Sequence, residues 1–337
     1  MLLRASVIYR LGVAAALTMA TSLAQAAPYT ALYAFGDSLS DAGNIYAATG
    51  GAQPVSPPYS QGRYTNGPVW VQDLAASLGL GPITPSLTGG TDYAYGGAQT
   101  GTTPVHTANP TDLSAQLTQF QGAVPHPAAS ALYTLWIGAN DLFTILGTPQ
   151  ITPAAAIIDA NAAIANVATF VSGLAKDGAK TLVLVTVPDL GKVPDITAQG
   201  VAASAAASQL SAYFDQALVS TVDGIASATG MTLDIVNSYA VIDAAVANPS
   251  AYGYSNVTAP CWTGNFTDPA SGTVCASSEA AQNQYLFWDG VHPTAAAHQV
   301  LGQAFAAAVP EPESYALMLA ALGAMGAVMR RRKAKQA

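Results

Sequence analysis

Positive charge is scarce in this chain of 337 residues, which carries 11 lysines and arginines against 19 acidic residues. Seven of the basic residues lie in the two terminal segments, so the stretch 27–309 keeps only Arg63, Lys176, Lys180 and Lys192 against 17 acidic residues. An acidic surface of this kind repels phosphate backbones and anionic lipid headgroups. We therefore exclude nucleic-acid binding, although the acidity itself identifies no substrate.

Neither end of the chain has an uninterrupted apolar run of the roughly 20 residues that a membrane-spanning helix needs. Residues 1–26 carry two arginines, then an apolar run over residues 11–20, then a small-x-small cleavage site at residues 24–26. This order predicts a secretory signal peptide that signal peptidase removes, so we exclude the segment from the fold. A permanent membrane anchor is disfavoured because the apolar run is short.

The segment 310–337 has three parts: Pro-Glu-Pro-Glu at residues 310–313, an apolar stretch at 315–329 and a basic cluster at 330–333. This tail resembles the PEP-CTERM sorting signal of Gram-negative bacteria. The resemblance implies export to the periplasm, the cell surface or the medium, transient association with the inner membrane, and removal by an exosortase-type protease. The basic cluster would stay on the cytoplasmic side. An ordinary amphipathic helix is the alternative, but the apolar stretch has no polar face.

Cysteine is almost absent, since Cys261 and Cys275 are the only two. In an exported protein an even pair indicates a disulfide, and no histidine lies nearby to complete a metal site. The bond would close a Gly/Thr/Asn/Ser-rich loop and contribute about 3 kcal/mol in the loop-entropy model. We expect it to steady the approach to the segment around Asp289.

Strand and helix patterns alternate between residues 27 and 309, which predicts one α/β domain with a parallel sheet and helices on both faces. Apolar, β-branched runs predict strands at residues 31–35, 131–137, 181–187 and, as the last strand, 232–236. Helical spacing predicts helices at about 70–78, 112–121, 152–175, 200–228 and 294–307. Two Gly- and Pro-containing stretches, 45–68 and 248–284, are expected to be irregular and to wall the binding pocket.

Two short motifs near opposite ends of this domain carry candidate catalytic residues. The tetrapeptide Gly-Asp-Ser-Leu at 36–39 follows the first strand, so Ser38 lies where open parallel sheets bind ligands. A serine becomes a nucleophile only when a base activates it. Asp289 and His292 supply a carboxylate that can orient an imidazole and an imidazole that can take the Ser38 proton. Either motif alone is usually a turn or a cap, but the pair predicts a serine hydrolase.

Two further segments would be interpreted as plain turns if taken alone, but each also holds N–H groups of the kind that an oxyanion needs. Residues 91–98 are expected to form a short strand that ends in two glycines, where the N–H of Gly97 can approach a ligand. The strand at 131–137 leads into Gly-Ala-Asn-Asp, and the side chain of Asn140 can add a second donor there.

In this order the four segments resemble the sequence blocks of the GDSL (SGNH) family of esterases and lipases. The resemblance implies a flavodoxin-like three-layer α/β/α sandwich and ester hydrolysis by Ser38, His292 and Asp289 through an acyl-enzyme. It also implies an oxyanion hole made by the backbone N–H groups of Ser38 and Gly97 and by the side chain of Asn140. No metal or organic cofactor is implied.

Two positions near these blocks have no settled role. Asp92 stands where the family usually has asparagine, and Arg63 belongs to a Gly-Arg-x-Thr-Asn-Gly segment that also resembles the family. Arg63 can bind substrate or tie its loop down by hydrogen bonds, and we favour the second role. Outside the motifs, His106 and His126 are expected to be solvent-exposed in loops, and His298 to be a packing or surface residue of the last helix.

The substrate stays open between three alternatives. A small-molecule or lipid ester is the first, and an acetylated exopolysaccharide is the second, because tails of this kind accompany exopolysaccharide producers. The third is a non-catalytic surface or matrix protein, which the intact Ser38, Asp289 and His292 disfavour. The Gly-x-Ser-x-Gly elbow of the larger α/β-hydrolase fold is absent.

Overall fold

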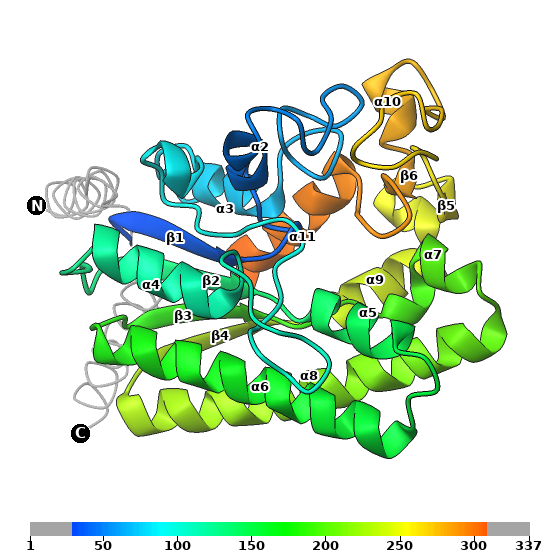
Figure 1. Ribbon diagram of the computed structural model, residues 1–337. Helices are drawn as coiled ribbons and strands as arrows, with labels where there is room; N and C mark the ends of the chain where they lie inside the picture. Colours follow the sequence, from blue (N-terminus) through cyan, green and yellow to red (C-terminus); the bar gives the residue numbers. More distant parts are fainter. Residues whose placement is uncertain (1–28, 309–337) are drawn as a thin grey trace, which may run out of the picture.

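Four parallel strands form the central sheet in the order β1-β2-β3-β4 of the computed structural model, which describes residues 29–308 (Figure 1). The predicted signal peptide and sorting segment lie outside the described residues. The strands are β1 (Ala31–Gly36), β2 (Ala131–Trp136), β3 (Thr181–Val185) and β4 (Thr232–Val236). All four predicted strands are therefore present and parallel.

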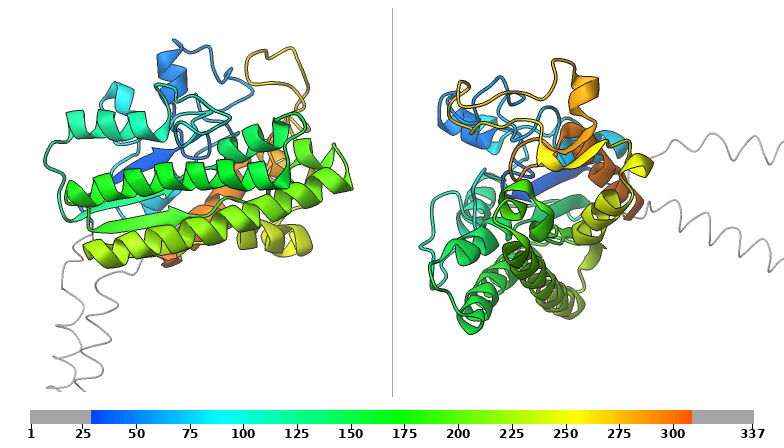
Figure 2. Two further views of the ribbon diagram at one scale, coloured as in Figure 1. Left: turned by 60° about the horizontal axis from the view of Figure 1, so that its bottom comes forward. Right: turned by 90° about the vertical axis from the view of Figure 1, so that its right-hand side faces the viewer.

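Helices cover both faces of this sheet, which gives the expected three layers (Figure 2). One face carries α4 (Leu113–Ala123), α6 (Pro153–Lys176) and α8 (Val201–Thr229), and the other carries α3 (Trp70–Ser77) and α11 (Ala295–Ala308). Alternation along each strand separates the two cores. On β2, Tyr133 packs toward Phe120 of α4, whereas Leu132 belongs to the cluster that holds Trp70 of α3.

The remaining elements connect these layers and surround the carboxyl ends of the strands. They are α2 (Asn44–Ala48), η1 (Ser86–Thr88), α5 (Ala139–Gly147), η2 (Leu190–Lys192), α7 (Pro194–Thr197), α9 (Ser238–Ala247), η3 (Pro249–Tyr252), β5 (Asn256–Pro260), α10 (Glu279–Gln282) and β6 (Tyr285–Phe287). Both stretches expected to be irregular are less so than predicted, because 45–68 includes most of α2 and 248–284 includes η3, β5 and α10. The prediction that 232–236 is the last strand is wrong, since β5 and β6 pair in a small second sheet.

The segment 91–98 does not form the predicted strand, but it lies along the free edge of β1. The backbone carbonyl of Thr91 accepts the N–H of Ala34. The backbone N–H groups of Tyr93 and Tyr95 donate to the carbonyls of Ala34 and Gly36, respectively. The pairing ends there because the chain turns at the glycine pair that follows. With this segment on one side of β1 and β2 on the other, the crossover direction reverses at β1, where open α/β sheets form a binding crevice.

Helix α6 is long and apolar enough, by length and composition, to cross a membrane. Its buried side chains, among them Phe170, Val171 and Leu174, belong to the main core of the domain. The helix packs against α8 and α4, so its apolar composition is that of a core helix within the part of the chain that the structure describes.

Candidate active site

The two motifs from opposite ends of the domain meet at the carboxyl end of β1. The Oγ atom of Ser38 lies 2.8 Å from Nε2 of His292. The other ring nitrogen, Nδ1, lies 2.7 Å from Oδ2 of Asp289 and 2.9 Å from its Oδ1. All three side chains are buried or nearly so, with Ser38 only 7% exposed. This chain of contacts can carry a proton from the hydroxyl to the imidazole while the carboxylate fixes the ring.

Opposite charges shift the pKa values of this pair in the directions that catalysis needs. Burial alone raises the pKa of Asp289, but the charge and hydrogen bond of His292 and a hydrogen bond from Tyr59 outweigh it, so the pKa is lowered. Burial alone lowers the pKa of His292, but Asp289 outweighs it, so the pKa is raised. An ionised Asp289 next to a more basic imidazole is the arrangement of a general base.

A tight turn after β1 presents the serine. Gly36 has a φ of +146°, and a Cβ atom there would clash with the carbonyl oxygen of Trp136. Asp37 accepts the N–H of Leu39 over 3.0 Å and stabilises the turn. Burial raises the pKa of Asp37 to about 7, more than this hydrogen bond and the charge of His292 lower it.

Three groups are candidate donors to an oxyanion at Ser38: the backbone N–H groups of Ser38 and Gly97 and the side-chain amide of Asn140. Among residues 29–308 no acceptor takes the backbone N–H of Ser38 or of Gly97. Gly97 has a φ of +78° and open space where a Cβ would stand. One amide hydrogen of Asn140 donates to the carbonyl of Ala98 over 2.9 Å, which orients the side chain and leaves its second hydrogen available. Donors of this kind stabilise a tetrahedral intermediate.

A small cavity of about 30 Å³ adjoins Ser38, His292 and Asn140. Its apolar walls come from the turn after β1, from α5, from the end of β3 and from the histidine loop, and they are Leu39, Ala139, Phe143, Pro188, Leu190 and Val291. The stretches 45–68 and 248–284, which were expected to wall the binding pocket, contribute no residue to the lining of this cavity. The stretch 45–68 contacts the triad directly, since the ring of Tyr64 lies beside that of His292, with centroids 5.2 Å apart.

Comparison with known proteins agrees with this geometry. The family model described as GDSL-like Lipase/Acylhydrolase matches residues 32–305. The chain belongs to this GDSL family. A second model, the PEP-CTERM protein-sorting motif, matches residues 308–333. Both family resemblances found in the sequence are thus confirmed, and the motif indicates export from a Gram-negative bacterium.

Curated relatives of this GDSL protein include a phosphatidylcholine-sterol acyltransferase of Aeromonas hydrophila, which is 29% identical over 82% of this chain and 88% of that protein. A thermolabile hemolysin of Vibrio parahaemolyticus is 27% identical over 80% of this chain and 61% of its own length. A GDSL esterase/lipase of Arabidopsis thaliana is 28% identical over 86% of this chain and 91% of that protein. Among solved structures, an extracellular lipase from Streptomyces rimosus covers 83% of this chain and 100% of its own, with 17% identity and a TM-score of 0.43.

Asp92, which stands where the GDSL family usually has asparagine, has a structural role in this protein. Asp92 is fully buried, and its two oxygens accept the N–H groups of Ala42 (2.6 Å) and Ala94 (2.9 Å). Burial raises its pKa well above the usual range, and the nearby charge of Asp41 raises it further. An asparagine in the same pose would have one oxygen for two donors. Asp92 therefore joins the turn after β1 to the segment that leads to Gly97.

Arg63 takes the structural role that we favoured. Its Nε donates to Oε1 of Gln72 over 2.6 Å, and its Nη1 donates to the carbonyl of Ser60 over 3.3 Å, so it fastens its loop to α3. The expectation for His106 is wrong. Its Nε2 lies 2.8 Å from Oδ2 of Asp112, and only 12% of its side chain is exposed. His126 is exposed as predicted.

His298 is a packing residue of α11, and burial lowers its pKa to about 3. Asp112 is the residue that precedes α4, but its side chain makes no capping bond to the helix and accepts N–H groups from Gln99 and Asn109. Asp141 orients a neighbour by accepting the N–H and the hydroxyl of Thr100. Between residues 29 and 308, no group of three or more His, Cys, Asp or Glu side chains is placed to hold a metal ion.

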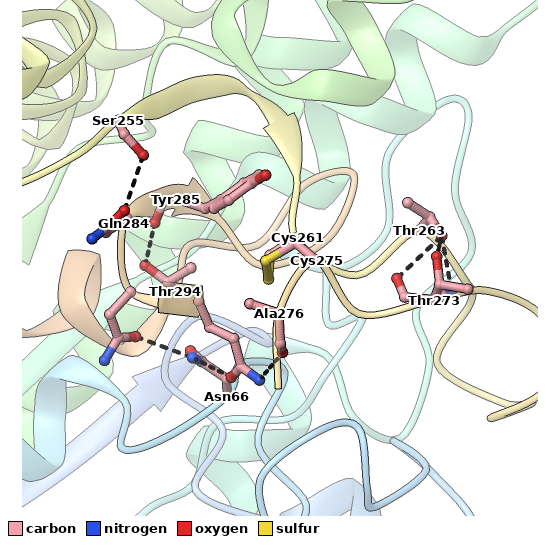
Figure 3. The surroundings of a disulfide bond; sticks show 12 residues. Asn66, Ser255, Cys261, Thr263, Thr273, Cys275, Ala276, Gln284, Tyr285 and Thr294 are labelled. Atoms are coloured by element: carbon pink, nitrogen blue, oxygen red, sulfur yellow. Dashed lines mark hydrogen bonds between the residues drawn. A yellow bond between two sulfur atoms is a disulfide. The ribbon is translucent and has the colours of Figure 1, made fainter. Parts of the chain in front are cut away.

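The sequence analysis missed Tyr59, whose hydroxyl donates to Oδ2 of Asp289 over 2.6 Å. Tyr59 comes from a proline-containing loop 230 residues earlier in the chain. No local pattern links the two, because the contact depends on how the loop packs against the histidine segment. The predicted disulfide between Cys261 and Cys275 is present, and it closes the chain segment that packs beside this loop (Figure 3).

Proposed function

We propose that this GDSL ester hydrolase acts through Ser38 as nucleophile and His292 as general base. Asp289 orients the imidazole and stabilises its positively charged form. As His292 takes the hydroxyl proton, Oγ of Ser38 attacks the ester carbonyl and a C–O bond forms. The carbonyl oxygen becomes negative and is held by the N–H groups of Ser38 and Gly97 and by the amide of Asn140. The observation that carries the proposal is the unbroken contact chain Ser38–His292–Asp289.

The tetrahedral intermediate collapses when the bond to the alcohol breaks, and His292 returns its proton to the departing alkoxide. Water then attacks the acyl-enzyme with His292 again as base, and the carboxylic acid leaves. Every proton in this cycle passes through one imidazole, and no atom changes its oxidation state, so the cycle balances with the ester and water alone. The relative named a phosphatidylcholine-sterol acyltransferase suggests an alcohol as a second acceptor in place of water, and product analysis with added alcohol tests this.

The cavity beside Ser38 supports short acyl groups as substrates. About 30 Å³ is room for roughly two water molecules or for one small substituent such as a methyl group. Apolar walls, Phe143 and Leu190 among them, suit the alkyl part of an acetyl or similar ester. This cavity, together with the sorting motif, favours a polysaccharide O-acetylesterase as a second and more specific candidate function.

We further propose the processing that the terminal segments imply. Signal peptidase would remove residues 1–26, and the hydrolase domain would occupy residues 27–309. The segment 310–337 would hold the protein transiently in the inner membrane until an exosortase-type protease cuts it, leaving the enzyme in the periplasm, at the cell surface or in the medium. The sorting motif at residues 308–333 supports this proposal.

The decisive experiment compares the purified protein with Ser38→Ala on p-nitrophenyl esters of increasing acyl length and on acetylated glycans. We expect hydrolysis that is greatest for acetyl and short acyl esters and that falls at least about 10³-fold in the variant. Release of acetate from glycan in preference to the synthetic esters would identify the O-acetylesterase. A folded wild-type protein that cleaves no ester and does not react with a fluorophosphonate at Ser38 would instead indicate a non-catalytic protein.

A further inference from the structure

One oxygen of Asp289 serves two partners at once. Oδ2 lies 2.7 Å from Nδ1 of His292 and accepts the hydroxyl of Tyr59 over 2.6 Å. The other oxygen, Oδ1, lies slightly farther from the same Nδ1, at 2.9 Å, and accepts the backbone N–H groups of Val291 (2.9 Å) and His292 (2.8 Å). The carboxylate is therefore held at both ends, and Tyr59 is the only side chain besides His292 that the structure of residues 29–308 places in hydrogen-bond contact with it.

Tyr59 is fixed in place by packing that leaves it little freedom. Its side chain is 2% exposed, and it forms a cluster with Cys261, Trp262 and Trp288. Its ring meets that of Trp288 edge-on, with centroids 6.2 Å apart. A phenol held this way offers its hydroxyl in one direction, toward Oδ2 of Asp289.

The disulfide segment forms the outer wall of this cluster. The N–H of Val55, in the Tyr59 loop, donates to the carbonyl of Phe266 over 2.8 Å. Phe266 lies between the two cysteines in sequence, and Cys261 itself contacts the cluster. A continuous path of contacts therefore runs from the disulfide through the aromatic cluster to the carboxylate that faces His292.

We propose that Tyr59 is a positioning residue for the catalytic reaction, which holds the Asp289 carboxylate in the orientation and charge distribution that His292 requires. The inference rests on the proposed function, since it acts through the same triad. A hydrogen bond from a neutral donor to an ionised carboxylate is a strong one. It stabilises the ionised form of Asp289 and withdraws charge from the oxygen that faces the imidazole.

Removal of this hydrogen bond should shift the pKa of His292 in a predictable direction. Without the phenol, Oδ2 of Asp289 keeps more negative charge for His292, so the imidazolium is stabilised and the pKa of His292 rises. Because the reaction needs neutral His292, the acidic limb of the pH–rate profile moves to higher pH. Further titratable or charged groups face this pair from other elements and stay in place in the variant: Asp37 after β1, Tyr64 in the Tyr59 loop, Asp195 in α7 and His298 in α11.

The experiment measures the rate at which a fluorophosphonate modifies Ser38, as a function of pH, in the full protein and in Tyr59→Phe. In this reaction a P–O bond to Ser38 forms, fluoride leaves and His292 takes the hydroxyl proton, so the rate reports the triad without knowledge of the substrate. Tyr59→Phe keeps the ring and removes only the hydroxyl. We expect the rate at neutral pH to fall about tenfold and the acidic limb to move to higher pH.

The matched control is Tyr133→Phe. Tyr133 is a fully buried tyrosine of β2 whose hydroxyl has no hydrogen-bond partner in the part of the chain that the structure describes. Its removal is the same chemical change at a site remote from Asp289, and we expect the wild-type rate and pH profile. Urea unfolding of each variant shows whether it is folded under the assay conditions.

A double-mutant cycle with Asp289→Asn separates positioning from general loosening of the loop. If Tyr59 acts through Asp289, Tyr59→Phe causes little further loss in the Asp289→Asn background. The inference is overturned if Tyr59→Phe changes neither the labelling rate nor the acidic limb of the pH profile. It is also overturned if Tyr59→Phe lowers the rate equally in the wild-type and Asp289→Asn proteins and leaves the acidic limb in place. Either result leaves the proposed function intact. Absence of labelling at Ser38 in the wild type would overturn the proposed function itself.

Discussion

Asp41 accepts the backbone N–H of Gly96 through its Oδ2 atom over 2.8 Å, and this bond ties the turn after β1 to the turn that presents Gly97. Its Oδ1 atom accepts the N–H groups of Gly43 (2.7 Å) and Asn44 (2.5 Å). Asp41 is fully buried, and burial raises its pKa to about 6 despite these hydrogen bonds. The position of Gly97, a proposed oxyanion donor, thus depends on a carboxylate that has no hydrogen bond with Ser38 or His292.

Asp41→Asn should therefore reduce catalysis more than binding. The amide keeps one acceptor oxygen and turns its NH₂ group toward N–H donors, so the bond to Gly96 or those to Gly43 and Asn44 must be lost. We expect kcat to fall about 10- to 100-fold with a smaller change in KM, and the free energy of unfolding to fall by about 1–3 kcal/mol. Steady-state kinetics and urea unfolding measure the two effects. A variant with the wild-type kcat would show that Gly97 is positioned without Asp41.

Asn140→Ala tests the side-chain donor of the proposed oxyanion hole. Removing one such donor costs roughly 10²- to 10³-fold in kcat when it contacts the developing charge. Asn166→Ala is a suitable control, because its amide also donates to a backbone carbonyl, that of Thr102 over 3.0 Å, but lies outside the cavity beside Ser38. Equal, small effects of both substitutions on kcat would remove Asn140 from the mechanism.

Features encoded by neighbouring residues were predictable from the sequence. The four strands of the sheet were found because apolar runs such as 181–185 need both faces buried, and the helices were found from their apolar spacing. Ser38, Asp289 and His292 were identified because they lie in two short motifs that resemble blocks of the GDSL family. The disulfide was predictable because the chain has only two cysteines.

Features that depend on contacts between distant segments were not predictable. Tyr59 reaches Asp289 only through the packing of a loop, and Asp92 is identified as a link between turns only by the two N–H groups it accepts. The walls of the small cavity come from four segments that are separate in sequence, so the composition of single loops did not identify them. His106 was misassigned because its partner, Asp112, lies across a turn that no periodicity describes.

Removal of the disulfide should loosen the Tyr59 loop before it unfolds the domain. The bond joins residues 14 apart in sequence, and a loop of this size contributes about 3 kcal/mol by constraining the unfolded chain. The Cys261→Ala/Cys275→Ala double variant, measured by urea unfolding, should lose about 2–4 kcal/mol.

The same variant should also label more slowly at Ser38, because Val55 and Tyr59 pack against the segment that the bond closes. Figure 3 shows a hydrogen bond between Thr263 and Thr273 on one side of the bond and the contacts of Asn66 on the other. Thr263→Ala weakens the same loop without opening it and serves as the control. If loss of the disulfide lowers the free energy of unfolding but leaves the rate of Ser38 labelling unchanged, the disulfide loop does not affect the position of Asp289.

Acidic groups buried in the fold should make the protein less stable as the pH rises. Burial raises the pKa of Asp215 to about 8, more than its hydrogen bonds with Val187 and Thr186 lower it. The unfolded chain releases this proton near pH 4, so between about pH 4 and pH 8 the folded state binds more protons than the unfolded state. The contribution of Asp215 to stability is therefore present in acid and is lost as the pH rises through 8.

Asp215→Asn removes this titration and keeps an acceptor for the N–H of Val187, which Oδ1 takes over 2.7 Å in the wild type. We expect the variant to lose less unfolding free energy than the wild type between pH 5 and pH 8, by an amount on the order of 1–3 kcal/mol. Asp223→Asn removes a carboxylate from the exposed surface of the same helix and controls for net charge. Urea unfolding at pH 5, 6.5 and 8 decides the matter: parallel curves for the wild type and Asp215→Asn would mean that this carboxyl is already ionised in the folded protein, with its charge offset by the hydrogen bonds it accepts.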